Sequence, residues 1–567
     1  MASYMEPEQL TYNQIVKRWA ALETEFTSWR EHGFQISSYL LPRSGRFITS
    51  DRNKGGRRHN NILDSTGTRA LRVLGAGLMG GATSPARPWF RLATSDTDLM
   101  KLQSVKVWTN TVSRLMLDIF QRSNTYRALH TMYEELGAFG TAACLIMDDD
   151  KDVIRMYPLT YGEFRIATNA RGEVCTLYRQ FDKTVVELVD EFGLKNCSTA
   201  VQNMYNSGTL DAWVTVLHAI EPRKDRNPGR LDGKNMPYKS VYVELNNRDK
   251  TVLSESGFKM FRVLCPRWSV SGGDIYGNGP GMEALGDIKQ LQHQQLRKAE
   301  CIDYQTKPPL QVPTTMKNRE LDRLPGGTSY VDMASASNQV KTLFDVNLRL
   351  DFLLADIQDV RQRINQCFYT DLFLMLSQAD NTSMTATEVA ERHEEKLLML
   401  GPVLERLHNE LLDPLIEITF ARMLDTPGLL PEPPEELQGA DLNVEFISML
   451  AQAQRSVSTN SVDRYVMALG NVAQFVNPDV RDRFDADHWA DAYADMLGID
   501  PEMIVDEEIA AQKRDARNKA QQQANAAAQA EQMAGAANKA ANAPTEGKNA
   551  LTDVISQFSG YTSPQGQ

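Results

Sequence analysis

The chain has 567 residues and a formal net charge of −12 at pH 7. This length is too great for one hydrophobic core and predicts about three to five substructures. The negative charge argues against a protein that grips nucleic acid along a broad basic face, but it leaves open a protein past which DNA slides. With 42% apolar and 24% charged residues, most of the chain should be ordinary globular protein.

The cysteines and the apolar runs exclude further classes. The six cysteines form no CxxC pair, so neither a zinc site nor a disulfide framework is indicated, and they suit a reducing cytosol. The N-terminus has no basic-then-apolar signal, and no stretch approaches the roughly 18 apolar residues that span a membrane. We expect no membrane association, and assembly in the cytoplasm unless another particle carries the protein out.

Apolar residues at three- and four-residue steps predict helices over most of the first 140 residues. The first contains Ile15 to Trp29 and ends before Pro42. Another starts after Ser95, which should cap it with Asp98 completing a capping box. A further helix is expected from about Thr125 to Leu136.

A glycine segment, GAGLMGG, interrupts this region. Gly75, Gly77 and Gly80 match GxGxxG, the spacing of a dinucleotide-binding loop. Such a loop needs a strand before it and a helix after it, but the preceding residues have a helical period, and Pro85 and Pro88 disfavour the following helix. We interpret the glycines as a helix end and expect no cofactor, with a dinucleotide-binding enzyme as the alternative.

Residues 141 to 270 predict a mixed β domain, with a hairpin at AACLIMDDDKDVIRMYPL, short strands at EVCTLYRQF, AWVTVLHAI, KSVYVEL and KMFRVLCPRW, and a helix at TVVELVDEFG. Residues 271 to 378 follow with a glycine-rich entry and a polar helix, then a proline-stiffened excursion. A second helix contains apolar residues at helical spacing from Leu350 to Met375. Two long helices joined at one end by a small knob should form an arm that projects from a body.

The arm leads into a polar loop, SQADNTS, at residues 377 to 383. In the MTATEV motif that follows, Thr385 can cap the next helix while Glu388 bonds back to its amide, or Glu388 can pair with Arg392. This helix should bend at Pro402 and Pro414 before a linker, PGLLPEPPEEL. Helices are expected from Ala440 to about Glu508. The Ala- and Gln-rich stretch beyond predicts a solitary helix, a thin bundle or disorder.

No pattern indicates catalysis or a metal site. The sequence lacks GxxxxGK[ST], GxSxG and HExxH. His393 falls on an apolar helix face and suits a core or interface position better than a ligand. The carboxylates at 485, 487, 491 and 495 suit a solvated surface. The RNKGGRR loop could touch phosphate or an acidic partner, or be an ordinary surface loop.

Four motifs together resemble the portal, or head-to-tail connector, proteins of short-tailed bacteriophages. They are SPARPWFRL at 84–92, YGNGPGMEALGDIKQL at 276–291, MTATEV at 384–389, and FISMLAQAQRS with the helices after it, which end in LGIDPEMI. The resemblance implies an α+β, mainly helical fold that assembles as a ring, usually of twelve copies. It divides the chain as follows: 1–270 wing (helical 1–140, mixed β 141–270), 271–306 entry and first stem helix, 307–345 small α/β clip, 346–376 second stem helix, 377–383 tunnel loop, 384–439 connecting helix and linker, 440–508 helical crown, and 509–567 barrel or disordered tail.

The resemblance also implies the partners and the location. Double-stranded DNA would pass through the ring at one vertex of the virion capsid. The clip would dock the terminase large subunit and then a tail adaptor protein, and major capsid, scaffold and internal core or ejection proteins are further candidates. The residues that it assigns are Ser377, Gln378, Asp380, Asn381, Thr382 and Ser383 in the tunnel loop, Thr385 and Glu388 in the cap after it, and Lys307, Pro308, Pro309, Pro313 and Pro325 in the clip.

The residues of the tunnel loop suit such a conduit. Each phosphate that a protein neutralises adds to affinity, so a basic bore would slow the DNA. Asn381, Thr382 and Ser383 are polar and uncharged, and Asp380 beside them is acidic. The sequence therefore favours a structural ring without enzymatic activity. The alternatives are the dinucleotide enzyme and a helical scaffold that binds only proteins.

Overall fold

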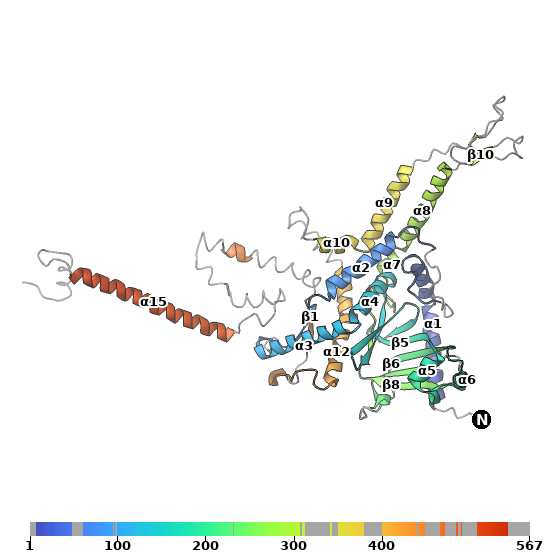
Figure 1. Ribbon diagram of the computed structural model, residues 1–567, viewed down its shortest axis with the longest axis horizontal. Coiled ribbons are helices and arrows are strands. Elements are labelled where there is room, and N and C mark those ends of the chain that lie inside the picture. The colour runs from blue at the N-terminus through green and yellow to red at the C-terminus, as the bar shows by residue number, and fades with distance from the viewer. Residues whose placement is uncertain are drawn as a thin grey trace, which may run out of the picture. The chain divides into compact units, whose positions relative to one another are not determined.

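A computed structural model describes residues 7–47, 60–94, 96, 99–230, 232–245, 247–306, 309–311, 341–342, 350–378, 400–437, 439, 442–447, 465–470, 484–485, 489 and 507–541. The chain divides into two units, Met1–Ala486 and Asp487–Gln567, and each is described by itself. The first unit mixes helices with small antiparallel sheets, as expected for an α+β protein (Figure 1).

Four helices build the start of the first unit. They are α1 (Pro7–Tyr39), α2 (Thr66–Ala82), α3 (Gln103–Arg122) and α4 (Thr125–Phe139), and they confirm the helical pattern of this region. The capping box is wrong for α3, because extended backbone at Leu102 separates α3 from the short 3-10 turn Leu99–Lys101. The helix therefore starts well after Ser95, and Ser95 and Asp98 lie outside the described residues.

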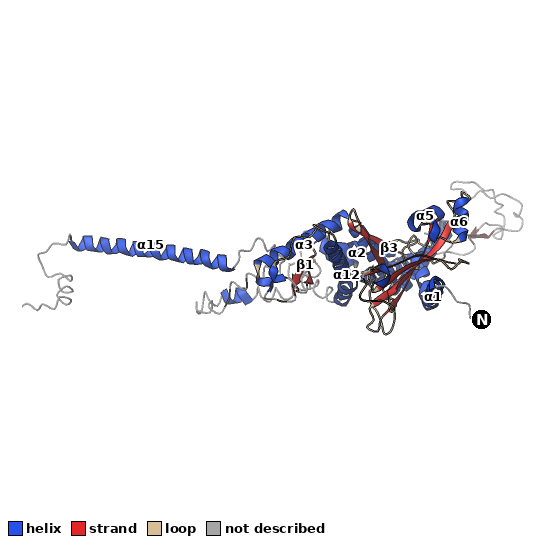
Figure 2. Ribbon diagram, turned by 90° about the horizontal axis from the view of Figure 1, so that it is seen from below, coloured by secondary structure: helices blue, strands red, loops and turns tan. Residues whose placement is uncertain are grey.

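A five-stranded antiparallel sheet follows, in which each strand pairs with the next along the chain. Its strands are β4 (Phe164–Thr168), β5 (Val174–Thr184), β6 (Trp213–Pro222), β7 (Tyr238–Glu244) and β8 (Val252–Phe258). Side chains alternate between its faces: Leu217 packs with Ile15 of α1, whereas Val216 packs with Leu188 of α5 (Val185–Phe192). Figure 2 shows α1 and the pair α5 (Val185–Phe192) and α6 (Thr199–Asn206) on opposite sides of the sheet.

Three elements of this domain were not predicted, and one was overestimated. Strand β8 reads VLSESGF and α6 reads TAVQNMYN, and both are too polar to show a clear period. Strand β4, FRIAT, is short and buried. Around KMFRVLCPRW only β9 (Val263–Leu264) is a strand, and it pairs with β2 (Ala143–Asp149).

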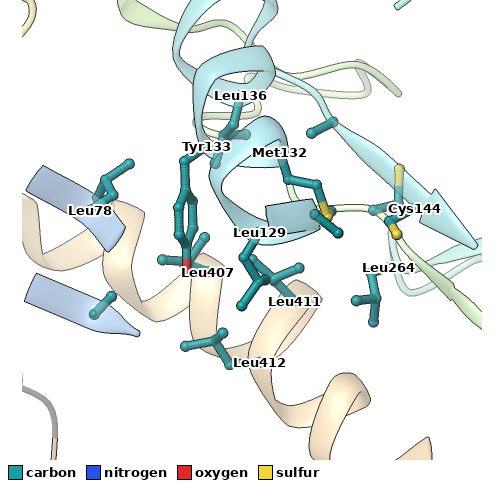
Figure 3. Close-up of a cluster of buried hydrophobic side chains, with 14 of the residues drawn as sticks. Leu78, Leu129, Met132, Tyr133, Leu136, Cys144, Leu264, Leu407, Leu411 and Leu412 are labelled. Atoms are coloured by element: carbon teal, nitrogen blue, oxygen red, sulfur yellow. The ribbon is translucent and has the colours of Figure 1, made fainter. Parts of the chain in front are cut away.

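The largest core joins segments that are distant in sequence. The predicted hairpin, β2 (Ala143–Asp149) with β3 (Val153–Leu159), packs beside α4. Against it lies the helical stretch from Leu400, which passes through a π-helical turn, His408–Leu412, into α12 (Asp413–Asp425). Figure 3 shows side chains from α2, α4, β2, β9 and the helical stretch after Leu400 in one cluster: Leu78, Leu129, Met132, Tyr133, Leu136, Cys144, Leu264, Leu407, Leu411 and Leu412.

A two-stranded sheet corrects the expectation that the chain is helical from Ala440 onward. Strand β1 (Phe90–Thr94) pairs with β12 (Leu442–Phe446), and Arg91 binds Glu445 at 2.8 Å. Apolar and polar residues alternate in LNVEF, and this strand period decides the local structure. Trp89 of the SPARPWFRL motif is buried and stacks on Phe446.

The second unit contains α15 (Glu507–Ala541), so that much of the Ala- and Gln-rich stretch is helical. Its side chains from Ala511 to Gly535 are all exposed. A helix of high-propensity residues is therefore present here, and residues 542–567 lie outside the described part of the chain.

A buried carboxylate connects α4 with the turn after β3. Glu135 accepts hydrogen bonds from the Thr160 hydroxyl at 2.8 Å and from the Tyr161 amide at 2.9 Å. Thr160 accepts in turn from the Gly45 amide at 2.7 Å, which ties the segment after α1 to the same point. Burial raises the pKa of Glu135 from 4.5 to about 7, although the hydrogen bonds from Thr160 and Tyr161 oppose this.

We expect the thermal stability to fall as the pH rises from about 4.5 to about 7, because only the folded chain holds the Glu135 proton in this range. Above pH 7 this contribution is lost and the curve should level. Glu135→Gln should flatten this pH dependence of the stability, which amounts to on the order of 3 kcal/mol. Calorimetry at several pH values would measure it. Exposed Glu432→Gln is the control, and an equal pH dependence in both variants would contradict the assignment.

Candidate functional site: the two-helix arm

The arm consists of α8 (Leu285–Thr306) and α9 (Leu350–Cys367), which lie side by side in Figure 1. The short helix α7 (Pro280–Glu283), within the YGNGPGMEALGDIKQL motif, leads into it. Gln294 of α8 donates a hydrogen bond to Asp356 of α9, and Arg363 of α9 pairs with Asp287 of α8 at 3.3 Å. These two contacts fix the antiparallel register, so that each step along α8 matches one step back along α9.

The base of the arm is attached to the residues just before α2. The side-chain oxygen of Gln292 accepts hydrogen bonds from the Leu63 amide at 2.6 Å and the Asp64 amide at 2.8 Å. Arg361 of α9 donates to the Asp64 carboxylate at 2.7 Å, and Gln295 donates to the same oxygen at 3.0 Å. A nearly buried carboxylate thus binds both helices of the arm at once.

Burial alone would raise the pKa of Asp64. The hydrogen bonds from Thr66 and Arg361 outweigh burial and hold the pKa below its ordinary value. Asp64 is therefore charged at neutral pH. This role could not be predicted from the sequence, because a single Asp before a helix is typical of an ordinary N-terminal cap.

At the far end of the arm, β10 (Leu310–Gln311) pairs antiparallel with β11 (Lys341–Thr342). Pro309 of the predicted clip comes directly before β10. Lys307, Pro308, Pro313 and Pro325 lie outside the described residues. The pairing agrees with a small knob that joins the two helices, and the contacts of the clip stay a prediction.

The second long helix is not continuous, which corrects its predicted course to residue 376. Helix α9 ends at Cys367, and α10 (Thr370–Gln378) starts after Tyr369, whose φ of 53° lies in the left-handed region. The Thr370 hydroxyl bonds to the Asn365 carbonyl at 3.1 Å and closes the joint. The break allows the buried side chains of Leu372 and Phe373 to pack in the body, so α10 departs from the direction of α9.

Helix α10 packs against α2 at one of the three glycines. A Cβ on Gly77 would lie 2.2 Å from the Phe373 ring, whereas one on Gly75 would lie 3.0 Å from Glu134, and one on Gly80 would meet nothing within 4 Å. All three glycines lie inside α2, which continues to Ala82, rather than at a helix end. Their amides therefore belong to the hydrogen-bond ladder of α2, and the GxGxxG match reflects helix packing rather than phosphate binding.

The structure reaches only the start of the predicted tunnel loop. Ser377 and Gln378, expected in the loop, are the last residues of α10, so the helix ends two residues later than predicted. Asp380, Asn381, Thr382, Ser383, Thr385 and Glu388 lie outside the described residues, as does His393. The chain is described again from Leu400.

Nothing in the described part of the chain resembles a metal centre. No group of three or more His, Cys, Asp or Glu side chains there could hold a metal ion. Among those residues, no helix is both long enough and apolar enough to cross a lipid bilayer.

The contact between Gly77 of α2 and Phe373 of α10 can be tested by substitution. Gly77→Ala should lower the stability by about 1 to 3 kcal/mol, because the new methyl group must displace Phe373. Gly80→Ala has open space and should raise it by up to about 1 kcal/mol through helix propensity. Thermal unfolding of both variants would measure the difference, and equal effects would contradict this packing.

The comparisons with known proteins agree on one family. The family model described as bacteriophage head to tail connecting protein matches residues 12–505. The probable portal protein of Bordetella phage BPP-1 is 59% identical over 555 residues, which cover 98% of this chain and 100% of that protein. The portal protein of Salmonella phage epsilon15 is 45% identical over 542 residues, which cover 95% and 97%.

A solved structure, the neck of an empty gene transfer agent particle, matches 80% of this chain and 97% of that one. It is 11% identical to this chain, with a TM-score of 0.35. The family model and the two relatives span nearly the whole chain. The chain therefore belongs to the bacteriophage head to tail connecting protein family.

Proposed function

We propose that this chain is the subunit of a portal ring, or head-to-tail connector, at one vertex of a phage capsid.

 The observation that best supports this proposal is the 59% identity to a probable portal protein along almost the full length of both chains. In this proposal the ring has twelve copies, double-stranded DNA enters and leaves through its axis, and the protein has no enzymatic activity.

The position of the two-helix arm indicates which element would form each part of the portal subunit. The helices α8 and α9 would be the stem, the residues between them the clip, and the residues after α10 the tunnel loop. The body around α1 to α4 and the five-stranded sheet would be the wing, and the residues after β12 the crown. The clip would dock the terminase large subunit during packaging and a tail adaptor afterwards, while capsid and scaffold proteins would surround the wing.

Sizing of the purified protein tests the ring. Light scattering should give a mass near twelve times 63.7 kDa, and negative-stain images should show an annulus with a central hole. A stable monomer at micromolar concentration would contradict the proposal. A hole too narrow for a duplex would leave a ring but remove the channel.

A charge change tests whether the tunnel loop faces the DNA. Changing Asn381, Thr382 and Ser383 to Lys should slow packaging and ejection, because each new cation neutralises a phosphate in transit. The drag should weaken as the salt concentration rises. The same substitutions at the exposed residues Asn206, Ser207 and Thr209 are the matched control. Equal rates in both variants would place residues 381–383 away from the channel.

A further inference from the structure

The outer half of the arm lacks a core of its own. In α8 the last buried residue is Gln294, and none from Gln295 to Thr306 is buried. In α9 none of residues 351–356 is buried, and burial starts at Ile357. Helices in proteins draw most of their stability from burying an apolar stripe, so this half of the arm requires a further partner.

Large apolar side chains are nevertheless present there. The exposed ones are Leu296, Ile302 and Tyr304 on α8, and Phe352 and Leu354 on α9. Leu296 is 45% exposed and Leu354 is 41% exposed. Exposed apolar residues gathered on one projection are typical of a protein interface.

Leu296 and Leu354 point away from each other. Gln294 faces α9, because it bonds to Asp356. Two residues along a helix correspond to a turn of about 200°, so Leu296 lies on the side of α8 opposite to α9. By the same reasoning, Leu354 lies on the side of α9 opposite to α8. The two leucines therefore occupy the two outer flanks of the arm.

The two leucines are also at the same height. The pairs Gln294 with Asp356 and Asp287 with Arg363 set the register of the two helices. In that register, two steps from Gln294 toward the tip of α8 match two steps from Asp356 toward the tip of α9. Leu296 is therefore level with Leu354.

We propose that adjacent copies of this chain meet through these flanks, with Leu296 of one copy against Leu354 of the next. The inference rests on the proposed function, since a ring repeats one contact between two different faces at every boundary. Equal height is the property that such a contact needs, because rotation without a rise closes a ring, whereas a rise produces a helical filament. The proposed contact places α8 and α9 of each copy side by side around the circumference of the ring.

Cysteine cross-linking tests this contact in the assembled ring. The background carries Cys175→Ser, Cys301→Ser and Cys367→Ser, which removes the cysteines that are only partly buried. Adding Leu296→Cys with Leu354→Cys should give, on oxidation, a ladder of linked chains up to the full ring on a non-reducing gel. Either substitution alone should give no ladder.

The matched control moves one cysteine along the same helix. Leu296→Cys with Gln362→Cys places the exposed second thiol eight residues closer to the base, about 12 Å lower, beyond the reach of a disulfide. It should give no ladder. Rings that link equally in both variants, or in neither, would overturn the proposed contact and leave the proposed function intact. If the wild-type chain forms no ring at all, both the proposed contact and the proposed function are overturned.

A second measurement does not depend on disulfide geometry. Leu296→Asp with Leu354→Asp should reduce the fraction of chains in rings at least tenfold, with an unchanged circular dichroism spectrum. Leu10→Asp replaces a leucine that is equally exposed, at 47%, but lies on α1, and it should leave that fraction unchanged. An undiminished ring fraction in the double variant would overturn the proposal.

Discussion

The position of the arm depends on two contacts made by α2 and the residues just before it. Before its first turn, Asp64 binds Arg361 and Gln295, and the amide groups around it bind Gln292. Inside α2, Gly77 leaves room for the Phe373 ring of α10. One helix therefore fixes both where the arm leaves the body and where the chain turns back into it. The interactions differ in kind, since the first is charged and specific in direction, whereas the second is a close fit that tolerates no added atom.

The elements with a clear apolar period could be predicted from the sequence. Helices α1 and α4, the β2–β3 hairpin and α9 follow from it, whereas α8 was predicted as a polar helix. The break at Tyr369 could not, because Leu372 continues the helical spacing of α9 and the left-handed φ is set by packing against the body. Strand β12 was missed because the residues after it predict helices, although apolar and polar residues alternate in LNVEF.

The candidate site was predicted less completely than the fold. The glycines were correctly separated from a dinucleotide site, but their packing role depends on Phe373, almost 300 residues further along, and no local pattern contains that contact. The ion pair between Asp64 and Arg361 likewise joins distant positions, and no local sequence pattern contains it. Contacts of this range join residues whose side chains have no unusual spacing, so they become visible only when the helices are placed side by side.

The pairing of β1 with β12 has a consequence for how the chain matures. Arg91 and Glu445 are separated by 354 positions, so a nascent chain emerging from the ribosome cannot complete this small sheet until most of its length has been made. Closing so long a loop is entropically costly, and contacts of such range slow folding. This two-stranded sheet is therefore among the last parts of the described chain to form, and any surface that depends on it is delayed until synthesis is nearly finished.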